Sequence, residues 1–256
     1  MNPVHPSAAH GFAAAAQTYV RGRPGYPPEL AGWLSGDLEL RAGRTCVDLG
    51  AGTGKFTRLL LQTGADVVAV EPVAEMREQL IASLPGTRAL AGTAQAMPLG
   101  DAAADAVVCA QAFHWFADGE ALQEIHRVLR PGGRLGLVWN VRDETVDWVR
   151  AMTDILTPYE GDTPRYRSGR WRLPFTGRWF TALEETVFPH QHVGDPQAVI
   201  VDRTLSVSFI ANLPDAERAG VETRLRDLIL SHPALRDRET VAFPYLTHAF
   251  RCTRVD

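Results

Sequence analysis

The sequence predicts a doubly wound α/β fold, because short apolar runs alternate with segments of helical periodicity. Runs of strand length occupy residues 45–49, 66–70 and 105–110. The last of these is apolar almost throughout, as expected of a strand that is buried on both faces. Strands that alternate with helices form βαβ units, in which the strands lie parallel in one sheet with helices on both of its faces.

The remaining patterns complete a mostly parallel sheet of seven strands. Met76, Leu80 and Leu84 share one face of an expected helix over 71–84, and Pro131-Gly132-Gly133 ends a later one. The other expected strands are 88–91, 134–139, 185–192 and 241–252. The other expected helices cover residues 7–19, 29–34, 54–63, 122–129 and 221–229. We expect residues 142–180 to be irregular.

The composition narrows the classes of partner. The 256 residues include 26 Lys+Arg and 30 Asp+Glu, which gives a net charge of −4. A mildly acidic chain with no basic run disfavours nucleic acid, because phosphate binding needs clustered positive charge. No apolar stretch approaches the ~18 residues of a membrane span, and no secretory signal opens the chain. We therefore expect a cytoplasmic protein without a membrane partner.

The three cysteines and the histidines do not form a metal set. Cys46, Cys109 and Cys252 lie far apart, with no histidine at the spacing of metal ligands. We expect them to be reduced and buried, and we expect the chemistry to need no metal.

The sharpest motif is the glycine-rich segment at residues 47–55, between a strand and a helix, where backbone N–H groups point outward. A dinucleotide fingerprint, G-x-G-x-x-G, fails because Lys55 takes its last position. A phosphate-binding P-loop fails because Leu49 and Phe56 replace its first Gly and its Ser/Thr. The loop is therefore built for a ligand without a pyrophosphate.

Two carboxylates indicate what that ligand carries. Asp48 beside the loop would repel a pyrophosphate but suits an ammonium group. Glu71 ends the second strand, 17 residues after Gly54, where an acidic side chain can accept hydrogen bonds from both hydroxyls of a ribose. A ligand with a ribose diol, an amino group and no phosphate is required, and S-adenosylmethionine meets all three demands.

Five motifs then carry a family resemblance. They are residues 48–54, 92–99, 105–116 and 128–133, and Tyr19 with residues 23–27. With these motifs the chain resembles class I S-adenosylmethionine-dependent methyltransferases, in the small-molecule branch near the trans-aconitate and ubiquinone-biosynthesis types. The match is good over residues 12–140 and holds only in outline elsewhere. The family usually has an acidic residue where Gln95 stands.

The resemblance assigns cofactor contacts. It implies that Tyr19 and Arg23 belong to an N-terminal cover, with Arg23 near the methionine carboxylate, and that Met76 contacts the adenine, although Met76 also suits core packing. The full set of expected cofactor-binding residues is Tyr19, Arg23, Asp48, Gly50, Ala51, Gly52, Thr53, Gly54, Glu71, Pro72, Met76, Thr93, Ala94, Gln95, Gln111 and Ala112.

His114 is the expected catalytic residue. It follows the fourth strand, at the carboxyl edge where open α/β sheets bind ligands, and its near-neutral titration suits a general base. A local packing role stays open. The expected substrate-binding residues are Tyr26, His114, Trp115, Trp139, Trp171 and Trp179.

The resulting hypothesis is a single methyltransferase domain. We expect residues 1–40 to be its N-terminal cap, 41–140 its cofactor-binding core, 141–183 a substrate roof inserted after strand five, and 184–256 the end of the sheet. The resemblance implies a Rossmann-like sheet with an antiparallel last strand. It also implies transfer of a methyl group to the oxygen, nitrogen or aromatic carbon of a small organic acceptor in specialised metabolism, with S-adenosylhomocysteine as product.

Three alternatives remain open. An RNA or protein methyltransferase is disfavoured by the charge and by the lack of an [DNS]-P-P-[FYW] motif after strand four. A non-catalytic S-adenosylmethionine-binding protein fits the same loop. A nicotinamide-dependent oxidoreductase is disfavoured by the failed fingerprint and by Asp48. The oligomeric state is not predicted.

Overall fold

The computed structural model describes residues 24–256. The expected helix at 7–19, Tyr19 and Arg23 lie outside these residues. The chain divides into two compact units. The core unit comprises Pro28–Trp139, Pro164–Phe188 and Thr247–Asp256, and the described part of the helical unit comprises residues 24–27, Asn140–Thr163 and Pro189–Leu246. The expectation of a single domain stays a prediction.

The sheet has seven strands in the order β3-β2-β1-β4-β5-β7-β6. Their bounds are β1 Thr45–Leu49, β2 Asp66–Val70, β3 Arg88–Leu90, β4 Ala104–Ala110, β5 Leu129–Arg142, β6 Glu184–Gly194 and β7 Val241–Thr253. Strands β1 to β5 pair in parallel. Strand β7 runs antiparallel to β5, as shown by the Arg254 N–H to Gly133 O and Asp143 N–H to Pro244 O hydrogen bonds. The predicted fold class is confirmed.

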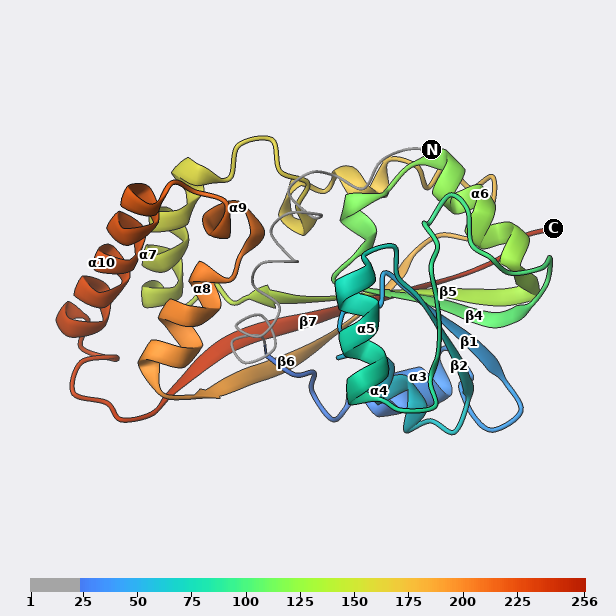
Figure 1. Ribbon diagram of the computed structural model, residues 1–256, viewed down its shortest axis with the longest axis horizontal. Coiled ribbons are helices and arrows are strands. Elements are labelled where there is room, and N and C mark those ends of the chain that lie inside the picture. The colour runs from blue at the N-terminus through green and yellow to red at the C-terminus, as the bar shows by residue number, and fades with distance from the viewer. Residues whose placement is uncertain (1–23) are drawn as a thin grey trace. The chain divides into compact units, whose positions relative to one another are not determined.

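The helices of the core unit follow the strands in the expected alternation (Figure 1). They are α3 Leu30–Gly36, α4 Thr57–Leu61, α5 Ala74–Ser83 and α6 Gly119–Val128. Short 3-10 turns span η1 Phe113–Trp115, η3 Tyr166–Ser168 and η4 Arg170–Arg172. Asp118 caps α6 because its carboxylate accepts the Ala121 N–H at 2.7 Å, and Leu122, Ile125 and Val128 form its buried stripe.

Strand β5 is longer than its sequence pattern indicates. Pro131 and its two glycines were expected to end the preceding helix and to leave a strand at 134–139. Helix α6 does end at Val128, but β5 begins at once with Leu129 and passes through the Pro-Gly-Gly segment. The register with β4 is irregular at this point, between Ala104 and Ala106. A bulge of this kind accommodates a proline that cannot donate to the ladder.

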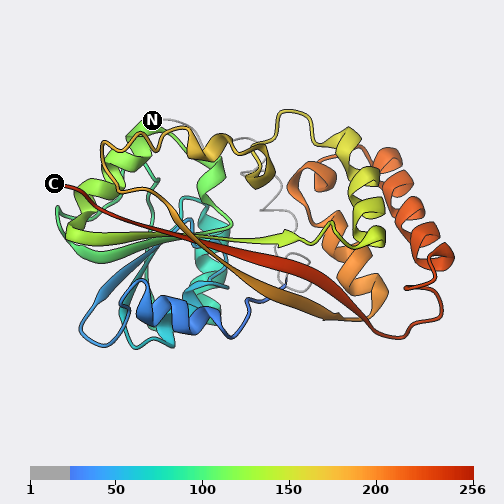
Figure 2. The same ribbon diagram turned by 180° about the vertical axis from the view of Figure 1, so that it is seen from behind.

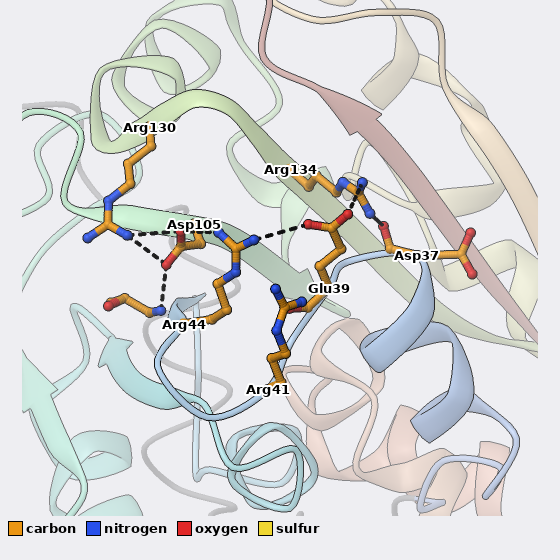
Figure 3. Close-up of polar contacts among 8 residues, drawn as sticks. Asp37, Glu39, Arg41, Arg44, Asp105, Arg130 and Arg134 are labelled. Atoms are coloured by element: carbon orange, nitrogen blue, oxygen red, sulfur yellow. Dashed lines mark hydrogen bonds and ion pairs between the residues drawn. The ribbon is translucent and has the colours of Figure 1, made fainter.

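An ion-pair network joins the amino-terminal ends of β1, β4 and β5 (Figure 3). Asp105 accepts hydrogen bonds from Thr45 N–H at 2.8 Å, Arg44 at 2.8 Å and Arg130 at 2.9 Å. Burial alone would raise the pKa of Asp105, but these donors hold it below its usual range. Glu39 pairs with Arg44 as well, at 3.3 Å. The opposite, carboxyl ends of the same strands carry the candidate site.

The helical unit holds its own apolar core, built on the helices that Figure 1 labels α7 to α10. Its helices are α7 Asp147–Leu156, η2 Thr157–Tyr159, the π-helix η5 Gln197–Asp202, α8 Arg203–Leu205, α9 Ser208–Ala211 and α10 Asp215–Ser231. Strands β6 and β7 run side by side, as Figure 2 shows from behind. No helix among the described residues has the length and apolarity that a membrane crossing requires.

The expectation of irregular structure over 142–180 was wrong for α7. This helix buries Trp148, Val149, Met152 and Leu156 against the helical unit's core, which includes Phe243. The four residues have helical spacing, but charged residues between them and the Arg-rich segment that follows masked the pattern. The burial of this face stabilises the helix far more than its intrinsic propensity does.

Candidate functional site

The glycine loop after β1 is held in a conformation that side chains rarely adopt. Gly50, Gly52 and Gly54 have φ angles of 73°, 56° and 83°. The Gly50 and Ala51 N–H groups donate to Val70 O at 2.8 and 3.3 Å, which ties the loop to the end of β2. A Cβ on Gly50 would lie 2.7 Å from the Cβ of Ala112. Positive φ and close approach both require glycine here.

Glu71 connects the end of β2 to the same loop. Its carboxylate accepts Gly52 N–H at 2.9 Å on one oxygen and Val73 N–H at 2.9 Å on the other. The side chain is buried. Burial raises the pKa of Glu71, while the Val73 and Gly52 N–H groups and Arg77 oppose that shift. Each oxygen retains acceptor capacity for a ligand hydroxyl, because a carboxylate has about four lone-pair positions.

Asp48 is the second carboxyl group of the site. Its side chain is 1% exposed, and Oδ2 accepts the Thr57 hydroxyl at 2.6 Å. Oδ1 is buried without a hydrogen-bond partner among residues 24–256. Burial raises the pKa of Asp48 to about 7, Thr57 opposes that shift, and the nearby charge of Glu71 adds to it. An unpartnered buried oxygen on an ionisable group suits a cationic ligand group, which would favour the ionised form.

The segment after β3 forms the side of the site expected to hold adenine. Thr93 and Ala96 exchange two backbone hydrogen bonds, of 3.3 and 3.2 Å. Gln95 Nε2 donates to Asp118 at 3.0 Å, and Ala94 is buried. Asp118 was not singled out in the sequence, although an Asp directly before a helix is a recognisable capping signal. It supplies a carboxylate next to the position where the family usually has one.

Three further predicted residues differ in how far they are buried. Met76 is 3% exposed, and its Sδ would lie 3.9 Å from a Cβ placed on Gly52. It thus packs directly beneath the glycine loop. Pro72 is exposed. Thr53 is half-buried on the loop itself.

The carboxyl end of β4 brings the predicted catalytic residue to the glycine loop. Gln111 has a φ of 58°, and its N–H donates to Val138 O at 2.8 Å. Ala112 is buried against Gly50. The turn η1 then places His114, half-buried, with its ring 5.1 Å from that of Trp115. A positive φ at a non-glycine residue is a strained feature typical of functional sites.

A hydrogen bond from Trp139 defines the state of His114. Trp139 Nε1 donates to His114 Nδ1 at 3.0 Å. An indole N–H can only donate, so Nδ1 must be the unprotonated nitrogen. The neutral ring therefore carries its proton on Nε2 and presents that atom as a donor. A general base would need an unprotonated Nε2, which requires the proton to move to Nδ1 and the Trp139 hydrogen bond to break.

An aromatic cluster packs against Trp139, the residue that donates to His114. Trp139 packs on Trp171 at 4.5 Å and on Tyr166 at 5.1 Å between ring centroids. Trp139 and Trp171 are 1% and 2% exposed, so both contribute to the core. Tyr166 was not predicted, because nothing in the local pattern distinguishes it from other aromatic residues of the Arg-rich segment.

The substrate contacts expected of Trp179 and Tyr26 stay predictions. Trp179 packs against His126 at 4.9 Å between ring centroids and lines a groove beside α6. His126 is half-buried and donates from Nε2 to Val255 O at 2.7 Å, so the end of the chain covers it. Tyr26 belongs to the helical unit.

Replacing Asp48 by Asn should change how stability depends on pH. The folded protein keeps the Asp48 proton up to about pH 7, whereas the unfolded chain loses it near pH ~4. Wild-type stability therefore falls between these values as the pH rises, by up to about 4 kcal/mol. Urea unfolding across this window should show the Asp48→Asn protein gaining stability relative to wild type. Asp66→Asn, at an exposed aspartate of β2, is the control; a parallel curve for Asp48→Asn would contradict the assignment.

The Trp139 hydrogen bond predicts one tautomer of His114. Long-range ¹H–¹⁵N correlation spectra above the titration of the ring should show Nδ1 unprotonated and Nε2 protonated. Trp139→Phe should convert the signal to a mixture of tautomers. Trp171→Phe removes a neighbouring indole that donates to Tyr166 O instead, and it should leave the tautomer unchanged. A proton on Nδ1 in the wild-type protein would refute the geometry.

Comparisons with known proteins agree with this architecture. The family profile described as "Methyltransferase domain" matches residues 47–137. An uncharacterized methyltransferase of Mycobacterium tuberculosis (strain ATCC 25618 / H37Rv) is 45% identical, over 94% of this chain and 95% of the relative. An uncharacterized methyltransferase-like protein of Schizosaccharomyces pombe is 37% identical, over 93% of each chain.

Solved structures share the fold at low sequence identity. A putative methyltransferase from an antibiotic biosynthesis pathway of Anabaena variabilis is 19% identical with a TM-score of 0.60, covering 90% of this chain and 98% of that one. A putative methyltransferase of Bacillus halodurans has a TM-score of 0.57 at 19% identity, covering 87% and 97%. By its sequence relatives and its sheet, this chain belongs to the class I methyltransferase family.

Proposed function

We propose that the protein transfers a methyl group from S-adenosylmethionine to a small organic acceptor. The observation that carries this proposal is the pair of buried carboxyl groups, Asp48 and Glu71, on either side of a positive-φ glycine loop. A phosphate-bearing cofactor would meet two negative charges there. An ammonium group and a ribose diol instead match an unpartnered carboxylate oxygen and a carboxylate with remaining acceptor capacity.

Different residues of the core unit would bind different parts of the cofactor. Asp48 would hold the ammonium group, and Glu71 the ribose hydroxyls, while Gly50 to Gly54 let the backbone approach closely. The adenine would lie between Met76 and the Thr93–Gln95 segment, next to Ala112. When bound, the cofactor supplies an electrophilic sulfonium methyl group and leaves as S-adenosylhomocysteine. Tyr19 and Arg23 remain proposed members of this set.

His114 would act on the acceptor through its Nε2 proton. Methyl transfer needs a nucleophilic atom held in line at ~3 Å from the methyl carbon, and positioning supplies much of the rate. A donor at Nε2 can orient the acceptor without removing a proton from it. This favours an acceptor atom that is already nucleophilic, such as a carboxylate oxygen, over a hydroxyl that needs a base. The general-base hypothesis is the rival that the tautomer measurement tests.

Two features support a small acceptor. The net charge of −4 offers no basic surface excess for RNA. A neighbouring structure, the Haemonchus contortus phosphoethanolamine-type N-methyltransferase solved with phosphomonomethylethanolamine and S-adenosylhomocysteine, has a TM-score of 0.55 at 13% identity and covers 98% of this chain and 58% of that one.

We propose a cytoplasmic enzyme. Residues 24–256 contain no cluster of three metal-binding side chains, and we propose that transfer needs no metal.

The class of acceptor can be tested by following a radioactive methyl group from the cofactor to the molecule that accepts it. Purified protein with methyl-tritiated S-adenosylmethionine and a mycobacterial extract should label the small-molecule fraction, and not RNA or protein. Asp48→Asn should transfer less, because it cannot supply the negative charge, whereas the exposed Asp66→Asn should transfer normally. Label in RNA or protein would contradict the small acceptor, and binding of S-adenosylhomocysteine without any transfer would indicate a non-catalytic protein.

A further inference from the structure

A pair of polar side chains faces the core of the helical unit from adjacent strands. The Asp143 N–H to Pro244 O hydrogen bond, at 3.1 Å, sets the register of β5 and β7. In an antiparallel pair the preceding and following residues then lie opposite each other, with their side chains on one face at the closer spacing. Arg142, the last residue of β5, is therefore the direct neighbour of Tyr245.

The Tyr245 hydroxyl is buried without a partner. Tyr245 is 2% exposed within the core of the helical unit, and its ring stacks on Phe243 at 4.7 Å. The hydroxyl oxygen has no hydrogen-bond partner among the described residues. Buried hydroxyl groups are almost always satisfied, because desolvation without a hydrogen bond costs free energy. Such an atom indicates a group that binds there.

A second guanidinium group joins this pair. Arg203, the first residue of α8, is half-buried, and its Nε is buried without a partner among residues 24–256. Burial lowers the pKa of Arg142, and the charge of Arg203 is the next strongest cause. Two like charges thus lie close together in a partly dry environment.

Two carboxylates also lie near Arg142. Glu144 and Glu160 attract the charge of Arg142, but each acts more weakly than Arg203 repels it. Glu144 already accepts the Thr153 hydroxyl at 2.9 Å. His190 is the other titratable side chain in ring contact with Tyr245, at 6.4 Å between ring centroids. The Tyr245 hydroxyl and Arg203 Nε nevertheless remain donors without a partner among residues 24–256.

We propose that Arg142, Arg203 and Tyr245 form a binding site in the helical unit for the oxyanion of a small molecule, either a carboxylate or a phosphate. Guanidinium groups bind such anions through paired N–H donors, and the tyrosine hydroxyl adds a third donor. The ligand neutralises the repulsion between the arginines and satisfies the buried hydroxyl. The site uses none of the residues proposed to bind S-adenosylmethionine.

Calorimetric titration at constant ionic strength tests the site with two probes, inorganic phosphate and malonate. The wild-type protein should bind at least one of them, and their relative affinity distinguishes a phosphate from a carboxylate site. Arg142→Gln, Arg203→Gln and Tyr245→Phe should each weaken that binding, the arginine variants at least tenfold. Arg236→Gln, which removes an exposed arginine of the same unit, should bind as wild type does. S-adenosylhomocysteine binding should be unchanged in all four, which separates this site from the proposed function.

A protection experiment on the unaltered protein covers the case in which a variant fails to fold. Phenylglyoxal modifies accessible arginines, and peptide mapping by mass spectrometry reports each one. The bound probe should slow the modification of Arg142 and Arg203 but not of Arg236. The proposal is overturned if the wild-type protein binds neither probe, if folded arginine variants bind as well as wild type, or if protection is equal at Arg236.

Discussion

The two hydrogen bonds that the Glu71 carboxylate accepts are the constraint on which the rest of the site depends. They join Gly52 of the glycine loop to Val73 at the start of α5, each at 2.9 Å. The strand ends of β1 and β2 are thereby held as one unit, and the glycines between them take positive φ angles. The same carboxylate that is proposed to bind the ribose thus also builds the loop that receives the cofactor.

This design buries negative charge that the apoprotein does not fully compensate. Asp48 has one buried oxygen without a partner among the described residues, and its pKa rises to about 7. Ionisation of the buried Asp48 carboxyl group lowers the stability of the free protein, and a cationic ligand group beside it restores that stability. Hydrogen bonding between Trp139 and His114 adds a second preset feature, because it fixes which nitrogen carries the proton before an acceptor arrives.

Features that depend on a short stretch of sequence could be predicted, whereas contacts between distant segments could not. Strands β1, β2 and β4, the glycine loop and the positions of Asp48 and Glu71 follow from apolar runs, turn residues and motif spacing within short windows. Contacts between distant segments do not: Trp139 to His114, Gln95 to Asp118 and the covering of His126 by Val255 each depend on sheet order. Helix α7 was not predicted because charged residues lie between the apolar residues of its buried face. Trp139 and Trp171 are both buried, and their contact with a substrate stays a prediction.

Calorimetry with S-adenosylhomocysteine on Glu71→Ala tests the central claim most directly. Hydrogen bonds to a charged group contribute about 1.5–3 kcal/mol, so affinity should fall about 10- to 100-fold from one site per chain in the wild type. Glu78→Ala, at an exposed glutamate of α5, should bind normally, and thermal unfolding should show that both variants are folded. Unchanged affinity in a folded Glu71→Ala protein would contradict the account, as would a wild-type protein that binds NADH instead.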